Sequence, residues 1–336
     1  MKNILLTLFL GIMTATCFAQ EKDIFEYRKL AEQGDAEAQF KLGLHYVNGD
    51  GVQQSDEEAA KWFSKAAEQG YAPAQFWLGV CYANGDGVPQ SDNEAAKWYS
   101  KAAEQGNAYA QCELGVCYSN GNGVPQSNEE AVKWYKMAAE QGDADAQRNL
   151  GVCYAKGNGV RQSYNEAAKL YRMAADQGDA KAQGLLGMCY VDGNGVKQSN
   201  TEAAKWFIMA AEQGNDVAQY LLGLCYAKGD GVKQSDTEAA KWLSKAAEQG
   251  LAAAQVELGK LYVNGKGVDQ DNELAVEWIK KAAEQDSPNA QFLLGLMYLE
   301  GKGVEKNEKK ALMWATKAYS QGYEKAYDLI KMITGK

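Results

Sequence analysis

Residues 31–66 read AEQGDAEAQFKLGLHYVNGDGVQQSDEEAAKWFSKA, and this stretch decides the fold because the rest of the chain repeats it. Eight copies follow one another every 36 residues and fill positions 31–318 without insertion or deletion; they start at Ala31, Ala67, Ala103, Ala139, Ala175, Ala211, Ala247 and Ala283. A fixed period of this length is typical of stacked structural repeats. The sequence of 336 residues therefore predicts one continuous array around a shared core rather than two globular domains.

The first half of each repeat predicts an amphipathic helix. Ala38, Leu42 and Tyr46 recur at a spacing of four residues and form one apolar stripe. The helix is expected to begin after residue 35 and to end near residue 48. Gly49 and Gly51 follow, and glycine tolerates the positive φ that a tight turn requires.

The second half predicts another helix. Ser55 and Glu58 have the spacing of a capping box, in which the serine oxygen accepts a backbone N–H and the glutamate reaches back to the serine N–H. Trp62 and Phe63 are expected to face inward, and Gly70 stands in the helix-terminating position. Two antiparallel helices joined by a glycine loop therefore make one unit.

A glycine in the middle of the first helix predicts close contact with a neighbouring helix. Gly43 has a counterpart in each of the eight repeats. Glycine in a helix interior costs about 1 kcal/mol relative to alanine. Such a residue, present eight times, is best explained by tight helix–helix contact.

This pattern resembles the Sel1-like repeat family, whose units are related to tetratricopeptide repeats. The matching positions in the first unit are Ala38, Leu42, Gly43, Tyr46, Gly49, Gly51, Val52, Ala59, Trp62, Lys65, Ala66, Ala67 and Gly70. The resemblance extends over about residues 20–336. It implies an all-α, right-handed α/α superhelical solenoid in which the first helix of every repeat lines the concave face. It also implies an adaptor that binds proteins in envelope assembly, signalling or host contact.

The two ends of the chain complete this array. Residues 20–30 are interpreted as an N-terminal capping half-repeat and residues 319–336 as a C-terminal capping helix. Solenoids need such ends to cover the core of the terminal repeats.

The first 19 residues have the features of a secretory signal peptide. Lys2 supplies a positive start, residues 4–13 are almost entirely apolar, and Ala19 precedes a possible cleavage site before Gln20. An exported protein, periplasmic or secreted, is the prediction. The alternative is a lipoprotein anchored through Cys17, although the residues around it make a poor lipobox. The apolar run is too short to span a bilayer.

Composition excludes some functions and disfavours others. The formal net charge is −9, and no basic cluster is present, which argues against nucleic acid as a partner. No phosphate-binding loop occurs, and the glycine loops lack the carboxylates that anchor calcium. We expect no cofactor and no metal.

Cysteine and histidine give no catalytic site. Five cysteines, Cys81, Cys117, Cys153, Cys189 and Cys225, share one repeat position that is His45, Leu261 and Met297 elsewhere. A position that accepts Cys, Leu and Met is a packing position. Equivalent helices lie about 8–10 Å apart, whereas a disulfide needs Cα atoms within about 7 Å. We predict free buried thiols, no disulfides and no enzyme.

Two other functions stay open. Cysteine-rich Sel1-repeat proteins that bind or hydrolyse β-lactams staple each unit with cysteines at positions that hold alanine here, for example Ala67 and Ala74. A β-lactam-binding or cell-wall-acting protein is therefore the first alternative. Binding of peptidoglycan or another glycan through concave aromatic side chains is the second.

The residues that differ between repeats mark where a partner could be recognised. The tetratricopeptide pattern places five positions of the first helix on the concave face, and at these positions the repeats vary while the apolar stripe does not. The face carries aromatic residues near both ends and cations near its middle, a composition that suits an extended protein or peptide segment. The candidate residues are Phe40, Leu44, Phe76, Tyr109, Arg148, Lys156, Lys181, Tyr220 and Phe292.

Overall fold

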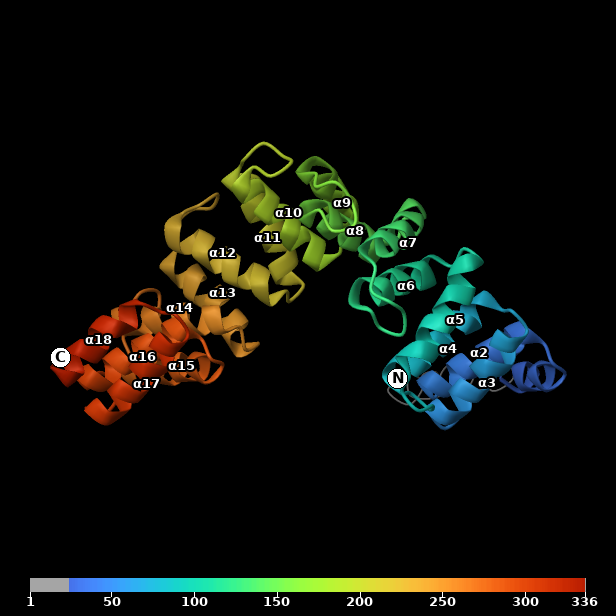
Figure 1. Ribbon diagram of the computed structural model, residues 1–336, viewed down its shortest axis with the longest axis horizontal. Helices are drawn as coiled ribbons and strands as arrows, with labels where there is room; N and C mark the ends of the chain where they lie inside the picture. Colours follow the sequence, from blue (N-terminus) through green and yellow to red (C-terminus); the bar gives the residue numbers. More distant parts are fainter. Residues whose placement is uncertain (1–23, 336) are drawn as a thin grey trace, which may run out of the picture. The chain divides into compact units, whose positions relative to one another are not determined.

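The computed structural model describes residues 24–335, and all regular structure within this range is helical (Figure 1). The predicted signal peptide, with Cys17, lies outside the described residues. Residues 24–32 form a helix that precedes the first repeat. The helices of residues 24–335 are too short or too polar to cross a membrane.

Each repeat contains the two predicted helices, here called the A helix and the B helix. The A helices are α2 (Ala36–Asn48), α4 (Ala72–Asn84), α6 (Ala108–Asn120), α8 (Ala144–Lys156), α10 (Ala180–Asp192), α12 (Asp216–Lys228), α14 (Ala252–Asn264) and α16 (Pro288–Glu300). The B helices are α3 (Asp56–Glu68), α5 (Asp92–Glu104), α7 (Asn128–Glu140), α9 (Tyr164–Asp176), α11 (Asn200–Glu212), α13 (Asp236–Glu248), α15 (Asn272–Glu284) and α17 (Glu308–Ser320). The last helix, α18 (Lys325–Thr334), follows the eighth repeat.

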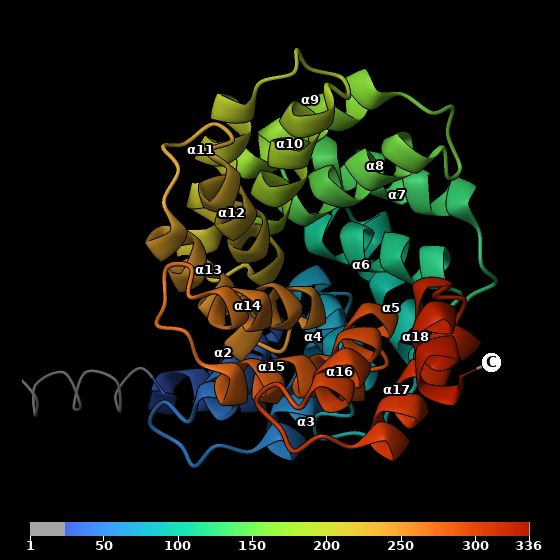
Figure 2. The same cartoon turned by 90° about the vertical axis from the view of Figure 1, so that its left-hand side faces the viewer.

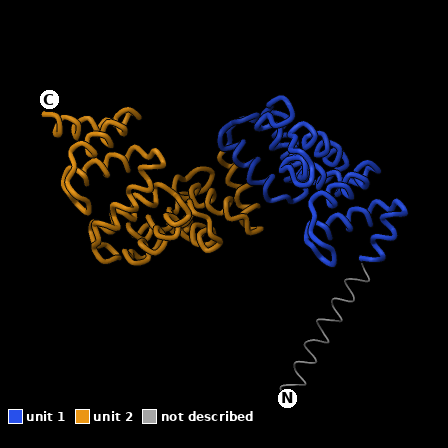
Figure 3. Tube along the Cα trace, turned by 90° about the horizontal axis from the view of Figure 1, so that it is seen from below, with its two compact units in different colours: residues 1–163 blue, residues 164–336 orange. Residues whose placement is uncertain are grey.

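The chain divides into two compact units, residues 1–163 and residues 164–336 (Figure 3). Within each unit, every helix packs against the helices that precede and follow it in the chain. In the second unit the A helices α10, α12, α14 and α16 follow one another along one side and the B helices along the other (Figure 2). The predicted all-α solenoid of paired helices is confirmed.

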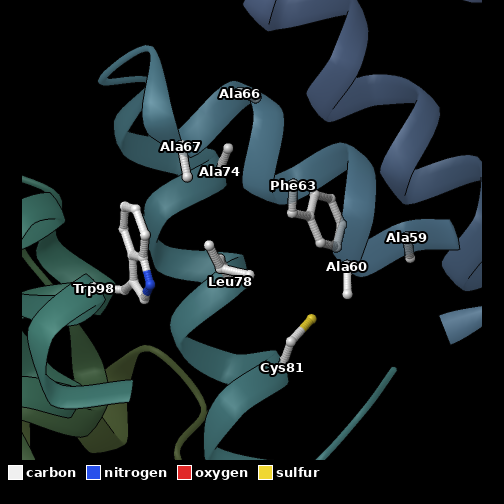
Figure 4. Close-up of a cluster of buried hydrophobic side chains, with 9 residues drawn as sticks. All are labelled: Ala59, Ala60, Phe63, Ala66, Ala67, Ala74, Leu78, Cys81 and Trp98. Atoms are coloured by element: carbon white, nitrogen blue, oxygen red, sulfur yellow. The ribbon is translucent and has the colours of Figure 1, made fainter. Parts of the chain in front are cut away.

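Glycine and alanine allow the two helices of a repeat to pack closely. A Cβ atom on Gly43 would lie 2.5 Å from Cε1 of Phe63, and one on Gly79 would lie 2.6 Å from the ring of Tyr99. Phe63 is fully buried. Figure 4 shows Leu78 and Cys81 of α4 beside the alanines and Phe63 of α3, with the Trp98 indole on the other side of Leu78. The mid-helix glycine therefore marks a close helix contact, as predicted.

The tyrosines that recur in all eight repeats lie at the edge of this core rather than at its centre. Tyr46 and its counterparts in the other repeats are all half-buried, and Trp62 is half-buried while Trp98 is buried. The tyrosines of the predicted apolar stripe therefore pack against the core from its edge. The centre is formed by the residue that follows each tryptophan position. This residue is Ala315 in the eighth repeat, and in the other seven it is Phe63, Tyr99, Tyr135, Tyr171, Phe207, Leu243 and Ile279.

The capping box forms only in part. Ser55 Oγ accepts a hydrogen bond from the backbone N–H of Glu58, as predicted. The Ser55 backbone N–H, however, donates to the carbonyl oxygen of Tyr46 at 3.0 Å. The Glu58 carboxylate instead lies 2.7 Å from Nζ of Lys61. The expected reciprocal bond is absent from this repeat because the end of the A helix already satisfies the serine N–H.

A buried glutamine links neighbouring repeats. Gln75 is 4 % exposed, and its amide nitrogen donates to the carbonyl oxygen of Ala67 at 3.1 Å. Its side-chain oxygen accepts from Nε2 of Gln105 at 2.7 Å. The same glutamine-to-glutamine bond joins residues 39 and 69, 111 and 141, 183 and 213, 219 and 249, 255 and 285, and 291 and 321. A buried polar group is tolerated when its hydrogen bonds are made, and this one fixes the spacing of adjacent repeats.

The second glycine of each loop also contacts the preceding repeat. Gly87 has a φ of 70°, and a Cβ atom on it would overlap the carbonyl group of Asp56 in the first turn of α3. The equivalent loop glycine of each later repeat lies equally close to the carbonyl group of the equivalent residue in the preceding repeat. These pairs, glycine first, are 123 and 92, 159 and 128, 195 and 164, 231 and 200, 267 and 236, and 303 and 272. Gly51 has no preceding repeat and lies instead against Ile24 of the N-terminal helix.

Candidate partner-binding face

The A-helix face is the part of each unit formed by the outward-facing side chains of the A helices. In the first unit it includes Tyr109, which is 65 % exposed, and in the second unit Met188, Val191 and Val217, which are 38–46 % exposed. An exposed apolar residue by itself is ordinary. Four such residues on the A helices, at positions that vary between repeats, make this face the candidate site.

The first predicted aromatic residue, Phe40, is half-buried and partly used in packing. The ring centroid of Phe40 lies 5.7 Å from that of Phe63 and 5.5 Å from that of Tyr71. Aromatic pairs attract at such separations. Leu44 is half-buried on the same helix and packs against the core of the first two repeats.

The second aromatic group contains the exposed tyrosine. Phe76 lies 6.0 Å from Tyr99 and 5.9 Å from Tyr109, centroid to centroid. Phe76 therefore packs between the buried ring of Tyr99 in α5 and the exposed ring of Tyr109 in α6. Of the predicted aromatic residues in the first unit, Tyr109 presents most of its surface to solvent.

The aromatic residues of the second unit are similarly half-buried. The ring centroid of Phe292 lies 5.4 Å from that of Tyr323, which stands two residues before α18. Tyr220 packs against the core around Leu243, and burial raises the pKa of its hydroxyl. Both side chains are therefore only partly accessible to a partner.

The predicted cations do not share one environment. Arg148 lies 2.6 Å from the carboxylate of Asp145, and its side chain is only 15 % exposed. Lys156 and Lys181 are exposed, at the end of α8 and the start of α10. Lys156 belongs to the first unit and Lys181 to the second, and each remains a candidate contact within its own unit.

A half-buried polar cluster around the buried Cys112 was not anticipated. Asn149 Nδ2 lies 3.9 Å from Sγ of Cys112, and Asp143 caps the start of α8 by accepting from the Ala146 N–H. Glu113 lies nearby, and burial, together with the charges of Asp145 and Asp143, raises the pKa of its carboxyl group. Glu113 occupies the position of Lys41 and Trp77, next to the invariant leucine. The variation at this position was a usable signal in the sequence.

Replacing Glu113 with glutamine should stabilise the protein at neutral pH. The raised pKa means that the folded state holds the Glu113 proton more tightly than the unfolded chain, where the pKa is about 4.3. The buried charge therefore destabilises the fold at pH 7, and this effect disappears as pH falls through the raised pKa. Urea unfolding at pH 7 and at pH 4 should show a gain for Glu113→Gln only at the higher pH.

Glu257→Gln is the matched control for this prediction. Glu257 has the same repeat position, but its carboxylate lies 2.7 Å from Nζ of Lys260. Its replacement removes an ion pair and should give no gain at pH 7. Equal gains for both variants, or a gain for Glu113→Gln that persists at pH 4, would contradict the assignment.

The six described cysteines are free thiols with little solvent access. All six are buried. Burial raises the pKa of Cys81, Cys117, Cys189 and Cys225 to about 11, so these thiols are protonated at neutral pH. A protonated thiol is a poor nucleophile. His45 is half-buried, and its Nδ1 lies 3.1 Å from the carbonyl oxygen of Asp50. Neither residue type forms a reactive constellation or a three-ligand metal cluster in residues 24–335.

The comparisons with known proteins agree with the fold. The chain is similar to the structure of a protective antigen present in uropathogenic Escherichia coli strains, described as displaying an SLR fold (38 % identity, 92 % of this chain, 67 % of the other, TM-score 0.79). It is also similar to a Sel1 repeat protein from Oxalobacter formigenes (35 % identity, 94 % and 93 % coverage, TM-score 0.67). No curated protein gives a significant match.

The sequence model of the Sel1 repeat covers nearly the whole described chain. It matches residues 36–71, 72–107, 108–143, 144–179, 180–215, 216–251, 252–287 and 288–323. These segments each contain one A helix and one B helix. Proteins of this kind typically act as scaffolds for protein–protein interaction. The chain belongs to the Sel1 repeat family.

Proposed function

We propose that this protein is an exported scaffold that binds an extended segment of another protein along the A-helix face. The observation that carries the proposal is the division between constant and variable positions. The constant Ala, Leu, Gly and Gln positions of the A helices are buried in every repeat, whereas exposed positions of the same helices differ from repeat to repeat. Residues that serve stacking are thereby separated from residues free to contact a partner.

The exposed residues have the chemistry of a protein-binding surface. Tyr109 presents a large aromatic side chain, and Met188 and Val217 present flexible and compact apolar ones. Aromatic residues and methionine are enriched at interfaces. A solenoid also offers a long surface over which several weak contacts with one extended segment add up.

Photo-cross-linking tests the location of binding. A photoreactive amino acid placed at Tyr109 or Val217, on the A helices, should give adducts with a partner in cells. The same residue placed at Glu104 or Glu248, exposed near the ends of B helices, should give none. Adducts only from the two B-helix positions would refute binding at the A-helix face.

Export is the second part of the proposal, and it is supported by the apolar segment of residues 4–13 that follows Lys2. Mass spectrometry of the protein purified from its native cells should find an N-terminus at Gln20. A diacylglycerol-modified N-terminus at Cys17 would show the lipoprotein alternative. An intact Met1 in the mature protein would refute export through this leader.

A further inference from the structure

An apolar cavity opens in the second unit between α10, α11 and α12. Its volume is about 160 Å³, and its apolar walls are Val191, Ala203, Phe207, Leu221, Leu224 and Cys225. Phe207 and Ala203 are almost fully buried, whereas Leu221 and Leu224 are half-buried and Val191 is 38 % exposed. The side of the cavity on the B helix is therefore buried, and the side on the A helices reaches the surface.

The corresponding space in the first unit is nearly filled. There the walls are Val47, Ala59, Phe63, Trp77, Val80 and Cys81, and the volume is about 50 Å³. Each of these six residues has an equivalent in the second unit, 144 positions later in the chain. Four of the six equivalents are the same amino acid, and Val80 is replaced by Leu224. The large change is Trp77, whose ring stacks 6.0 Å from Phe63 and which is replaced by Leu221. The smaller leucine leaves the space that the indole occupies.

The cavity has the size and lining of known binding cavities. A dry apolar cavity of about 150 Å³ in another protein admits benzene or xenon. A side chain no larger than a phenyl ring therefore fits the space around Leu221. The Cys225 thiol lines the cavity as an apolar group. Burial raises its pKa to about 11, so the thiol is protonated at neutral pH and packs like a small apolar side chain.

Polar groups at the mouth suit a peptide backbone. Asn200, Lys228 and Asp230 border the cavity, and Asn200 Nδ2 lies 3.5 Å from Oδ1 of Asp230. The Lys228 ammonium is a hydrogen-bond donor that can meet a peptide carbonyl, and the Asp230 carboxylate is an acceptor that can meet a peptide N–H. Met188 lies one helical turn before Val191 and extends the apolar rim along α10.

We propose that this cavity receives one apolar side chain, of up to phenyl-ring size, from the extended segment of the partner protein. The proposal rests on the proposed function, to which it adds a specific anchor point. A buried apolar anchor in a pocket, surrounded by polar contacts, is the arrangement that concentrates binding energy at protein interfaces.

Xenon tests the cavity without any partner. The ¹²⁹Xe NMR shift of dissolved xenon should move with the concentration of the wild-type protein, and Leu221→Trp should remove most of this dependence. Leu293→Trp, the same substitution at the same position of α16, serves as the control and should leave the dependence nearly as in wild type. Equal xenon responses for the wild type and Leu221→Trp would overturn the cavity as a site.

Peptides test the occupant. A displayed library of random 12-residue peptides should yield binders of the purified wild-type protein that share one apolar residue, and alanine at that residue should weaken binding at least tenfold. Leu221→Trp should weaken the same peptides at least tenfold, about 1.4 kcal/mol, and Leu293→Trp less than twofold. Val191→Asp, at the exposed mouth, provides a second variant that does not depend on fitting an indole into the core.

The xenon and peptide experiments together distinguish an error in the proposed cavity site from an error in the proposed scaffold function. Peptides that bind the wild type, Leu221→Trp and Val191→Asp equally would overturn the anchor and leave binding at the A-helix face intact. A protein that binds xenon at this cavity but selects no peptide would overturn both, since the cavity would then take small apolar molecules only. Far-UV circular dichroism of each variant verifies that the helices are retained.

Discussion

Gly87→Ala is expected to lower the free energy of unfolding by about 2–5 kcal/mol. The substitution combines two costs. A non-glycine residue at the φ of 70° found there costs roughly 1–2 kcal/mol. The added methyl group would also overlap the backbone of Asp56, and inserting a methyl group into a close-packed contact adds about 1–3 kcal/mol. Backbone atoms in a helical turn cannot move aside as a flexible side chain can. Urea unfolding followed by circular dichroism measures the loss.

Gly70→Ala isolates the contribution of the contact. Gly70 also has a positive φ, of 88°, but nothing lies within 4 Å of the position that its Cβ would take. Its replacement should cost only the backbone term, about 1–2 kcal/mol. If the two variants lost equal stability, the contact between the loop and the preceding repeat would have no energetic role.

Phe207→Ala should destabilise the second unit by about 3–5 kcal/mol. Phe207 is 1 % exposed and is one of the largest side chains at the centre of the repeat core. Removing the buried phenyl ring loses the free energy of its transfer from water. It also enlarges the existing cavity of about 160 Å³ that Phe207 lines. Unfolding in urea, followed by the near-ultraviolet signal of the buried tryptophans, should show the loss as a lower midpoint.

Met209→Ala is the matched control on the same helix. Met209 is 44 % exposed and lies two residues from Phe207 in α11. Substitutions at such surface positions usually change stability by less than about 0.5 kcal/mol. A loss for Met209→Ala as large as that for Phe207→Ala would contradict the assignment of Phe207 to the core.

The period and the local chemistry predicted the helices well. The recurrence of Leu42 and Tyr46, the glycines after residue 48 and the serine at residue 55 place the ends of α2 and the start of α3 within a residue or two of their observed positions. These features are local: a cap, a turn and an apolar stripe depend on neighbours in the sequence. Gly43 could be interpreted for the same reason, since its cost in a helix needs a compensating contact.

Features that depend on contacts between different helices could not be derived in this way. The Glu58 side chain was expected at the Ser55 N–H because the two residues are close in sequence, but the Tyr46 carbonyl of the preceding helix reaches that N–H instead. Tyr46 and its counterparts do not vary between repeats, and they belong to the same apolar stripe as the buried Leu42. Constancy, however, does not distinguish the centre of a helix interface from its edge.

The candidate site shows the same limit. Exposed Tyr109 and the two lysines, Lys156 and Lys181, could be found from variation between repeats. The cavity at Leu221 could not, because it arises from a difference in volume between leucine and tryptophan at one position and becomes visible only when α10, α11 and α12 enclose it. Nothing in the sequence marks an unfilled space.

The contact between each loop glycine and the helix before it bears on how such a chain changes its length during evolution. Because the contact joins a repeat only to its immediate predecessor, gaining or losing a whole 36-residue period recreates the same junction at the new seam. An insertion or deletion of any other length shifts the register, so that a residue with a side chain takes the place of the glycine at this contact. Recombination between copies in the gene is therefore tolerated in whole periods, and the uninterrupted spacing of the eight copies is the expected outcome.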